Sequence, residues 1–164
     1  MYKTILSLLM LIAVVTGLQA GEKQFITFNA DKIQRQGNSK YCVINSLNNT
    51  ISISGGAPEA KASWQHLVLP FPFKPSADKT FIISGEICTS NMSGAFKVAA
   101  RLIGASDKTI SYQGVVISEN QDWTPFLKKF TISDKVAKLQ LYLIGVKLGS
   151  NSKVELRKFA VEEK

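Results

Sequence analysis

Short alternations of apolar and polar residues, broken by Gly, Asn, Ser, Asp and Pro, run through the chain after residue 20. No convincing helical stripe appears there, and alternation over a few residues is typical of strands with one buried face. The pattern predicts about ten strands, at residues 24–29, 40–46, 50–54, 63–69, 80–90, 95–104, 109–118, 125–133, 137–145 and 152–161. We therefore expect an all-β fold, a two-sheet antiparallel β-sandwich of the jelly-roll type.

Parity within three of these strands predicts which side chains face the core. The inward set comprises Phe81, Ile83, Ile87, Phe96, Val98, Ala100, Leu102, Leu139, Leu141 and Leu143. The side chains of the opposite parity, which are expected to face outward, are not all charged. If the three strands share a sheet, one polar surface with an aromatic residue in it would contain Glu86, Arg101, Gln140 and Tyr142.

The first 20 residues have the pattern of a cleavable export signal. Lys3 provides the positive start, residues 5–18 an uncharged apolar segment, and Ala20 a small residue before the cut. The apolar segment is short for a membrane span. Residues 21–164 then form a single domain without a membrane span, and we expect the protein to be secreted or periplasmic.

The formal net charge of +8 favours acidic partners, which include anionic polysaccharide, membrane surfaces and nucleic acid. The basic residues are scattered along the chain, however, and a surface charged for solubility is the favoured explanation. An exported protein would encounter little nucleic acid. Among these partners, an acidic polysaccharide suits an exported protein best.

An oxidising compartment would allow Cys42 and Cys88 to form a disulfide, although two buried free thiols have the same pattern. Together with His66, the two cysteines make a poor set of metal ligands, so no metal site is expected.

His66 lies on a predicted strand and is interpreted as structural. Glu119 and Asp122 lie in a predicted turn. No catalytic motif is present, and neither enzyme activity nor a cofactor is predicted.

Three segments of the second half, in this order, resemble family 4/9 carbohydrate-binding modules, which are galactose-binding-like jelly rolls. They are "QHLVLPFPFKPSADKTFIISGEICTS", "QDWTPFLKKFTIS" and "LQLYLIGVKLGSNSKVELRKFAVEE". The resemblance covers about residues 64–163 and implies the fold more directly than the ligand. Many members of this family hold a structural calcium through an aspartate in the last strand. Arg157 and Lys158 occupy the corresponding positions here, and cations cannot bind calcium.

The family pattern also bears on the two tryptophans. The residue that matches Trp123 usually packs inside the sandwich, so we predict that Trp123 is a core residue rather than a ligand platform. The pattern does not require a tryptophan at Trp64. Exposed aromatic rings stack on sugar rings, which makes Trp64 the preferred candidate platform, although a half-buried strand position is as common.

The sequence thus predicts a non-catalytic carbohydrate-binding domain. Its candidate ligand-binding residues are Trp64, Glu86, Arg101, Tyr112, Gln140 and Tyr142. The alternative is a structural or protein-interaction sandwich of a secreted or cell-surface assembly. A contiguous apolar patch on one sheet would favour this alternative.

Overall fold

The computed structural model of the protein describes residues 21–37, 43–54 and 64–164. Within these ranges the chain forms strands, with one 3-10 helix at Ala30–Lys32. The strands are β1 (Lys23–Phe25), β2 (Gln34–Gly37), β3 (Val43–Leu47), β4 (Thr50–Ser54), β5 (Trp64–Pro70), β6 (Thr80–Ser90), β7 (Ala95–Ile103), β8 (Thr109–Ile117), β9 (Gln121–Thr131), β10 (Lys138–Val146) and β11 (Lys153–Glu163). The expected export signal, residues 1–20, lies outside the described residues.

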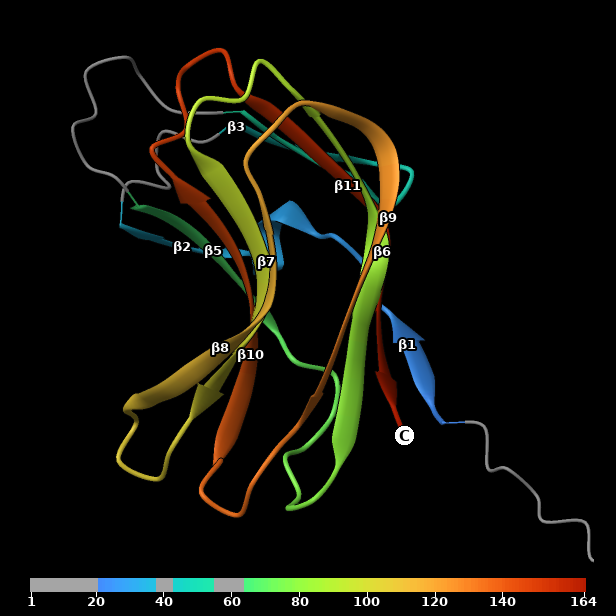
Figure 1. Ribbon diagram of the computed structural model, residues 1–164, viewed down its shortest axis with the longest axis vertical. Helices are drawn as coiled ribbons and strands as arrows, with labels where there is room; N and C mark the ends of the chain where they lie inside the picture. The colour runs from blue at the N-terminus through green and yellow to red at the C-terminus, as the bar shows by residue number, and fades with distance from the viewer. Residues whose placement is uncertain (1–20, 38–42, 55–63) are drawn as a thin grey trace, which may run out of the picture.

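The strands form two antiparallel sheets that face each other (Figure 1). We call the first the five-stranded sheet, with the order β2-β5-β10-β7-β8. The second, the six-stranded sheet, has the order β3-β4-β11-β6-β9, and β1 pairs with the C-terminal half of β11. The predicted two-sheet sandwich is confirmed.

Three strands differ from their prediction. β1 ends at Phe25, whereas the predicted strand continued to residue 29. β2 was not predicted because "QRQG" contains no apolar residue; it is held by backbone pairing with β5. β9 begins at Gln121 and therefore includes Trp123, which was expected at the strand entrance. A tight hairpin turn joins β3 and β4, with the positive φ angles at Asn48 and Asn49 that such a turn requires.

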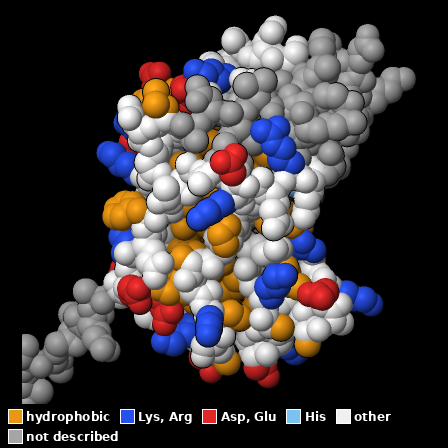
Figure 2. All heavy atoms as spheres, turned by 180° about the vertical axis from the view of Figure 1, so that it is seen from behind, with side chains coloured by type: hydrophobic (Ala, Val, Ile, Leu, Met, Phe, Trp, Pro, Cys, Tyr) orange, Lys and Arg blue, Asp and Glu red, His pale blue; other side chains and the backbone are white. Residues whose placement is uncertain are grey.

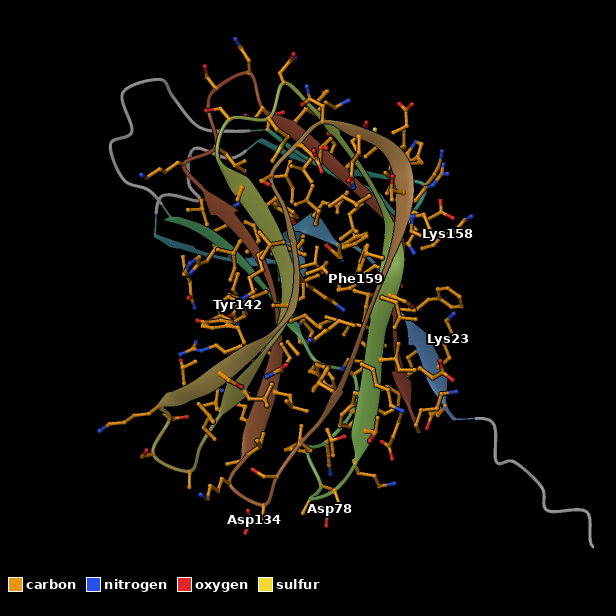
Figure 3. The ribbon with its side chains drawn as sticks, viewed as in Figure 1. Lys23, Asp78, Asp134, Tyr142, Lys158 and Phe159 are labelled. Carbon is orange, nitrogen blue, oxygen red and sulfur yellow. The ribbon has the colours of Figure 1, made fainter. Side chains whose placement is uncertain are left out.

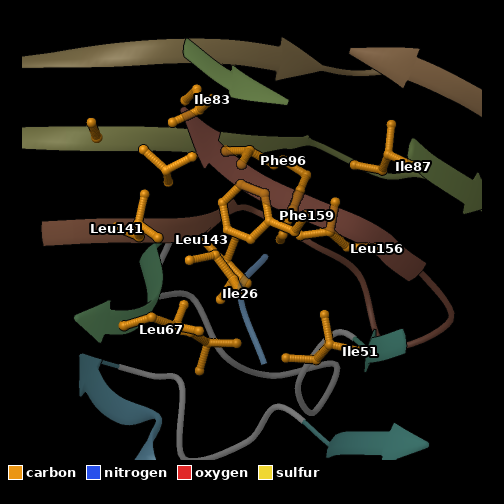
Figure 4. Packing of buried hydrophobic residues seen from close by; sticks show 14 of the residues in the cluster. Ile26, Ile51, Leu67, Ile83, Ile87, Phe96, Leu141, Leu143, Leu156 and Phe159 are labelled. Atoms are coloured by element: carbon orange, nitrogen blue, oxygen red, sulfur yellow. The ribbon is translucent and has the colours of Figure 1, made fainter. Parts of the chain in front are cut away.

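The predicted inward parity is confirmed on both sheets, because all ten side chains of the inward set belong to the buried core. They interdigitate between the layers (Figure 4). Phe159 of β11 lies at the centre of this packing, between the sheets, and is fully buried. Its ring stacks on Phe28 with centroids 6.1 Å apart and packs against Phe126 at 6.2 Å.

A β-bulge places Phe159 in the core. The register between β11 and β6 shifts between Arg157 and Ala160, and Lys158 has a positive φ angle of 51°. The extra residue allows Arg157 and Lys158 to remain outside while Phe159 turns inward. A lysine in this left-handed conformation is uncommon and persists only where the surrounding structure holds it.

We predict that Phe159→Ala lowers the free energy of unfolding by about 3–5 kcal/mol, because it removes a central aromatic ring and leaves a cavity. Ile110→Ala, at a side chain that is 48% exposed, is the matched control and should change it by less than about 0.5 kcal/mol. Chemical denaturation followed by circular dichroism measures both. Equal effects of the two substitutions would contradict the central position of Phe159.

Candidate functional site

The outer face of the five-stranded sheet brings together polar and aromatic side chains from four strands. Tyr142 of β10 lies opposite Val68 of β5 and Ala99 of β7 in the register. The neighbouring row contains Gln140, Arg101 and Tyr112, since Gln140 pairs with Arg101 and Arg101 with Tyr112. The predicted polar surface is therefore correct for Arg101, Gln140 and Tyr142, and Tyr112 joins them.

Tyr142 is the centre of this face, although its ring is not a free platform. Only 1% of it is exposed, because the rings of Tyr112 and His66 pack edge-on against it at 5.8 Å and 5.7 Å. Val68 and Ile144 complete a small buried cluster on this outer side. Because Tyr142 is enclosed on all sides, it supports the side chains around it and cannot stack on a ligand. The half-buried Tyr112 is the tyrosine of this face that could do so.

Arg101 is fixed in place by its neighbours. Its Nη1 donates a hydrogen bond of 2.6 Å to the Tyr142 hydroxyl, and its Nε donates to Thr109 at 2.8 Å. The guanidinium lies over the Tyr142 ring, 5.3 Å from the centroid. The Tyr142 hydroxyl in turn donates to Gln36 of β2 at 3.3 Å. A guanidinium held this way has lost side-chain entropy before any ligand arrives.

The charge on this sheet has one sign. Within the bounds of β2, β5, β7, β8 and β10 there is no Asp or Glu, whereas outward positions of these strands carry Lys97, Arg101 and Lys138. Lys97 lies over the Tyr112 ring at 5.3 Å. Cations close together in one face, with no carboxylate in its strands, produce a positive potential that attracts anions.

A hollow of about 400 Å³ adjoins the aromatic cluster on the same side of the sheet. It is lined by Lys32, Gln34, Val68, Leu69, Pro70, Phe71, Lys138, Leu139 and Gln140. Gln140 therefore links the hollow to Arg101, its register partner. An amide and two ammonium groups over an apolar floor can bind a ligand that has both polar groups and C–H faces.

Glu86 does not belong to this face, and the expectation that it shares a surface with Arg101 is wrong. β6 lies in the six-stranded sheet, where the Glu86 carboxylate accepts hydrogen bonds from Lys158 at 2.6 Å and Arg157 at 2.7 Å. These hydrogen bonds, that of Lys158 first, lower the pKa of Glu86. The carboxylate is thus already paired with two cations.

Trp123 is also placed differently from the prediction. It is half-buried and lies outside the core cluster, with the Arg157 guanidinium 4.0 Å from its ring centroid. Arg157 faces outward beside Glu86, so the indole lies on the outer side of the six-stranded sheet. Strand parity explains this placement: Phe126 and Phe130 of β9 face the core, so Trp123, at an odd position of the same strand, faces outward.

Two predicted residues lie partly or wholly outside the described structure. The backbone of Trp64 begins β5 opposite Val146, while its side chain lies outside the described residues. Cys42 also lies outside them, so its pairing with Cys88 stays a prediction. Cys88 is half-buried, and burial raises the pKa of its thiol.

The sequence interpretation missed Lys97, Gln36 and the role of His66. Lys97 has the same outward parity as Arg101, four residues away, and this was a usable signal. Gln36 belongs to the unpredicted β2. His66 is half-buried; burial first, and the nearby Arg101 second, lower the pKa of its imidazole. It is therefore neutral at physiological pH.

The other surfaces offer less chemistry. An apolar groove of about 160 Å³ lies near Phe25, Ile33 and Pro72, and Figure 2 shows hydrophobic side chains between charged ones on the rear of the molecule. Across residues 21–37, 43–54 and 64–164, no three His, Cys, Asp or Glu side chains form a potential metal-binding group. The described part of the chain also has no helix long and apolar enough to cross a membrane.

Comparison with known proteins identifies the fold. No family model matches the sequence, and no curated protein matches it. Among solved structures, the chain is similar to the CBM22-1 xylan-binding domain of Paenibacillus barcinonensis Xyn10C, with 15% identity, a TM-score of 0.60, and coverage of 88% of this chain and 96% of the other. It is similar to a family 4 carbohydrate-binding module, with 12% identity and a TM-score of 0.55. The match covers 74% of this chain and 88% of the other. It also resembles a chain of the glycosylation-associated Gap123 complex of Streptococcus agalactiae, with 11% identity and a TM-score of 0.57. This match covers 87% of this chain and 44% of the other. The expected likeness to carbohydrate-binding jelly rolls is confirmed for the fold.

We predict that His66 makes stability depend on pH. Its pKa is lowered in the folded state, so the unfolded chain binds a proton more readily, and the free energy of unfolding falls as the pH drops through about 6.5. Denaturation of the unmodified protein and of His66→Gln between about pH 8 and about pH 5 measures this. The difference in stability between the two proteins should change over this range; a constant difference would contradict the prediction.

Proposed function

We propose that this protein is an exported, non-catalytic carbohydrate-binding domain that recognises an acidic polysaccharide on the outer face of the five-stranded sheet. The observation that carries the proposal is the array of Arg101, Lys97, Tyr112 and Tyr142 on strands without a carboxylate. The fold, shared with carbohydrate-binding modules, is compatible with this function.

Each group has a distinct part in the proposed recognition. Arg101 binds a carboxylate or sulfate of the glycan with the N–H donors that Thr109 and Tyr142 do not occupy. Tyr112 stacks on the C–H face of a sugar ring, and Gln140 hydrogen-bonds to hydroxyl groups. Tyr142 positions Arg101. Trp64, which begins a strand of the same sheet, is proposed as a second stacking platform.

The affinity of such a face is modest. A sugar gives up hydrogen bonds to water when it binds, and only the excess of new contacts over this loss appears as affinity. Lys97, Arg101 and Lys138 add an electrostatic attraction that weakens as salt is added. Specificity for acidic over neutral glycans then comes from the cations, since Tyr112 and Gln140 serve either class equally.

A second candidate function is a protein-interaction domain. One observation favours it: Phe25 and Leu127, which are 62% and 63% exposed, lie on the opposite sheet, away from the cationic face. The two functions use different sheets and are compatible with each other.

Isothermal titration calorimetry with polygalacturonate and with neutral xylan tests the main proposal. We expect binding to polygalacturonate that weakens with salt, and Arg101→Ala should weaken it by about 10- to 100-fold because a charge-assisted hydrogen bond is lost. Tyr112→Ala and Trp64→Ala should weaken binding to both classes of glycan. Thermal unfolding of each variant verifies that it is folded.

Glu86→Gln is the matched control, because it changes a charge on the other sheet. It should leave the affinity unchanged. If Arg101→Ala and Glu86→Gln bind polygalacturonate as tightly as the unmodified protein, the site is not on this face. If the folded protein binds no glycan, the carbohydrate-binding function is wrong and the interaction-domain function takes its place.

A further inference from the structure

The segment that joins β1 to β2 crosses from the six-stranded sheet to the five-stranded sheet (Figure 1). It is anchored in the core. The Ile26 N–H donates a hydrogen bond of 2.8 Å to the Phe159 carbonyl, and the Phe28 ring stacks on that of Phe159 at the centre of the sandwich (Figure 3). Phe25 and Thr27 alternate with the buried residues and are exposed. The segment therefore presents exposed side chains from a backbone that the core holds in place.

An apolar groove of about 160 Å³ lies between this segment and the end of β5. Its walls include the Phe25 ring, which is 62% exposed, and the rings of Pro70 and Pro72. Ile33 and Leu69, which are both buried, line its inner side. An apolar cavity of about 150 Å³ holds a benzene molecule, so this groove has room for one six-membered ring.

The groove adjoins the hollow of about 400 Å³ beside Gln140, because Lys32 and Leu69 line both spaces. The hollow adds the ammonium group of Lys138 and the amides of Gln34 and Gln140. An apolar space and a polar, cationic space therefore meet at Lys32.

The two ammonium groups of the hollow have no anionic partner in the structure. The 3-10 turn positions Lys32, whose N–H donates a hydrogen bond of 3.0 Å to the Asn29 carbonyl. In the part of the chain that the structure describes, neither Lys32 nor Lys138 forms an ion pair. No carboxylate is among the described residues that line the two spaces; Asp31, next to Lys32, lines neither. Cations without a neighbouring carboxylate attract an anion.

We propose that the groove and the hollow together form a binding site for a small aromatic acid, bound as its anion. The aromatic ring lies in the groove against Phe25, Pro70 and Pro72, where it excludes water from apolar surface. The acid group lies at the boundary and accepts a charge-assisted hydrogen bond from Lys32. Lys138 adds electrostatic attraction from the hollow.

The size of the groove determines the class of ligand. A protein partner buries about 800 Å² on each side of an interface, which a space for one ring does not provide. An acid without a ring would leave the groove empty, and a neutral aromatic molecule would leave Lys32 without its anion. The site goes beyond the proposed glycan recognition and does not rest on it, because Phe25 and Lys32 carry it rather than Arg101.

Amide NMR spectra of the isotope-labelled protein, titrated with phenylacetate, test the proposal. We expect a Kd of about 1 mM, because so small a ligand makes few contacts, and signal shifts at Thr27, Ile33 and Leu69. Phenylacetamide has the same shape without the charge, and acetate has the charge without the ring. Both should bind about 3- to 10-fold more weakly than phenylacetate.

Two variants separate the contributions of charge and ring. Lys32→Met removes the ammonium group and keeps most of the apolar stem; it should weaken phenylacetate by about 3- to 10-fold and leave phenylacetamide unchanged. Phe25→Ala should weaken both ligands by similar factors, because both lose the same wall of the groove. Lys129→Met, at an exposed cation of the six-stranded sheet that lines neither space, is the matched control and should keep both affinities. Circular dichroism verifies that each variant is folded.

Three results would overturn the proposal: no binding of phenylacetate at about 10 mM, signal shifts confined to residues away from the groove, or an unchanged affinity in Lys32→Met. Equal binding of phenylacetate and phenylacetamide would also overturn it, since the anion would then have no part. The titration with polygalacturonate is a separate measurement. Because glycan recognition depends on Arg101 and Tyr112, either site can fail while the other stands.

Discussion

Packing between the two sheets determines what every outer face can do. Each strand contributes alternate side chains to the core, so the side chains of the other parity must lie outside. Phe159 shows how strictly this applies, because β11 needs a bulge and a left-handed lysine to turn this ring inward. The same bulge leaves Arg157 and Lys158 outside together, where both bind Glu86. Core packing and surface chemistry are therefore set by the same backbone irregularity.

The two outer faces differ in charge rather than in shape. On the six-stranded sheet acidic and basic side chains alternate and pair, as Glu86 does with Arg157 and Lys158. On the five-stranded sheet the strands hold cations only, and two of them lie over tyrosine rings. Strands that carry cations and no carboxylate produce a positive potential, whereas ion pairs on the other face reduce its net field. The two outer faces therefore differ in electrostatic character.

The sequence predicted the parts of the fold that depend on local pattern. Strand parity was right for Leu141 and its neighbours because a period of two is imposed by the backbone itself. Glu86 was assigned to the wrong face because strand pairing depends on the topology, and β6 crosses to the other sheet. Trp123 was misplaced because the family pattern was followed in place of parity: Phe126 and Phe130 face the core, so alternation along β9 puts Trp123 outside. The predicted grouping of Arg101, Gln140 and Tyr142 on one face was right because parity and topology agreed for these residues.

The burial of Tyr142 explains why a face built on a sheet can be specific. A sheet offers no loop that closes over a ligand, so its side chains must be positioned before binding. Tyr142 has no freedom to move, being enclosed by His66, Tyr112 and Val68, and its hydroxyl connects Arg101 to Gln36. Arg101 is consequently ordered in the unbound protein, and a ligand does not bear the cost of ordering it. If this face binds an anion, as proposed, the order of Arg101 contributes to the affinity.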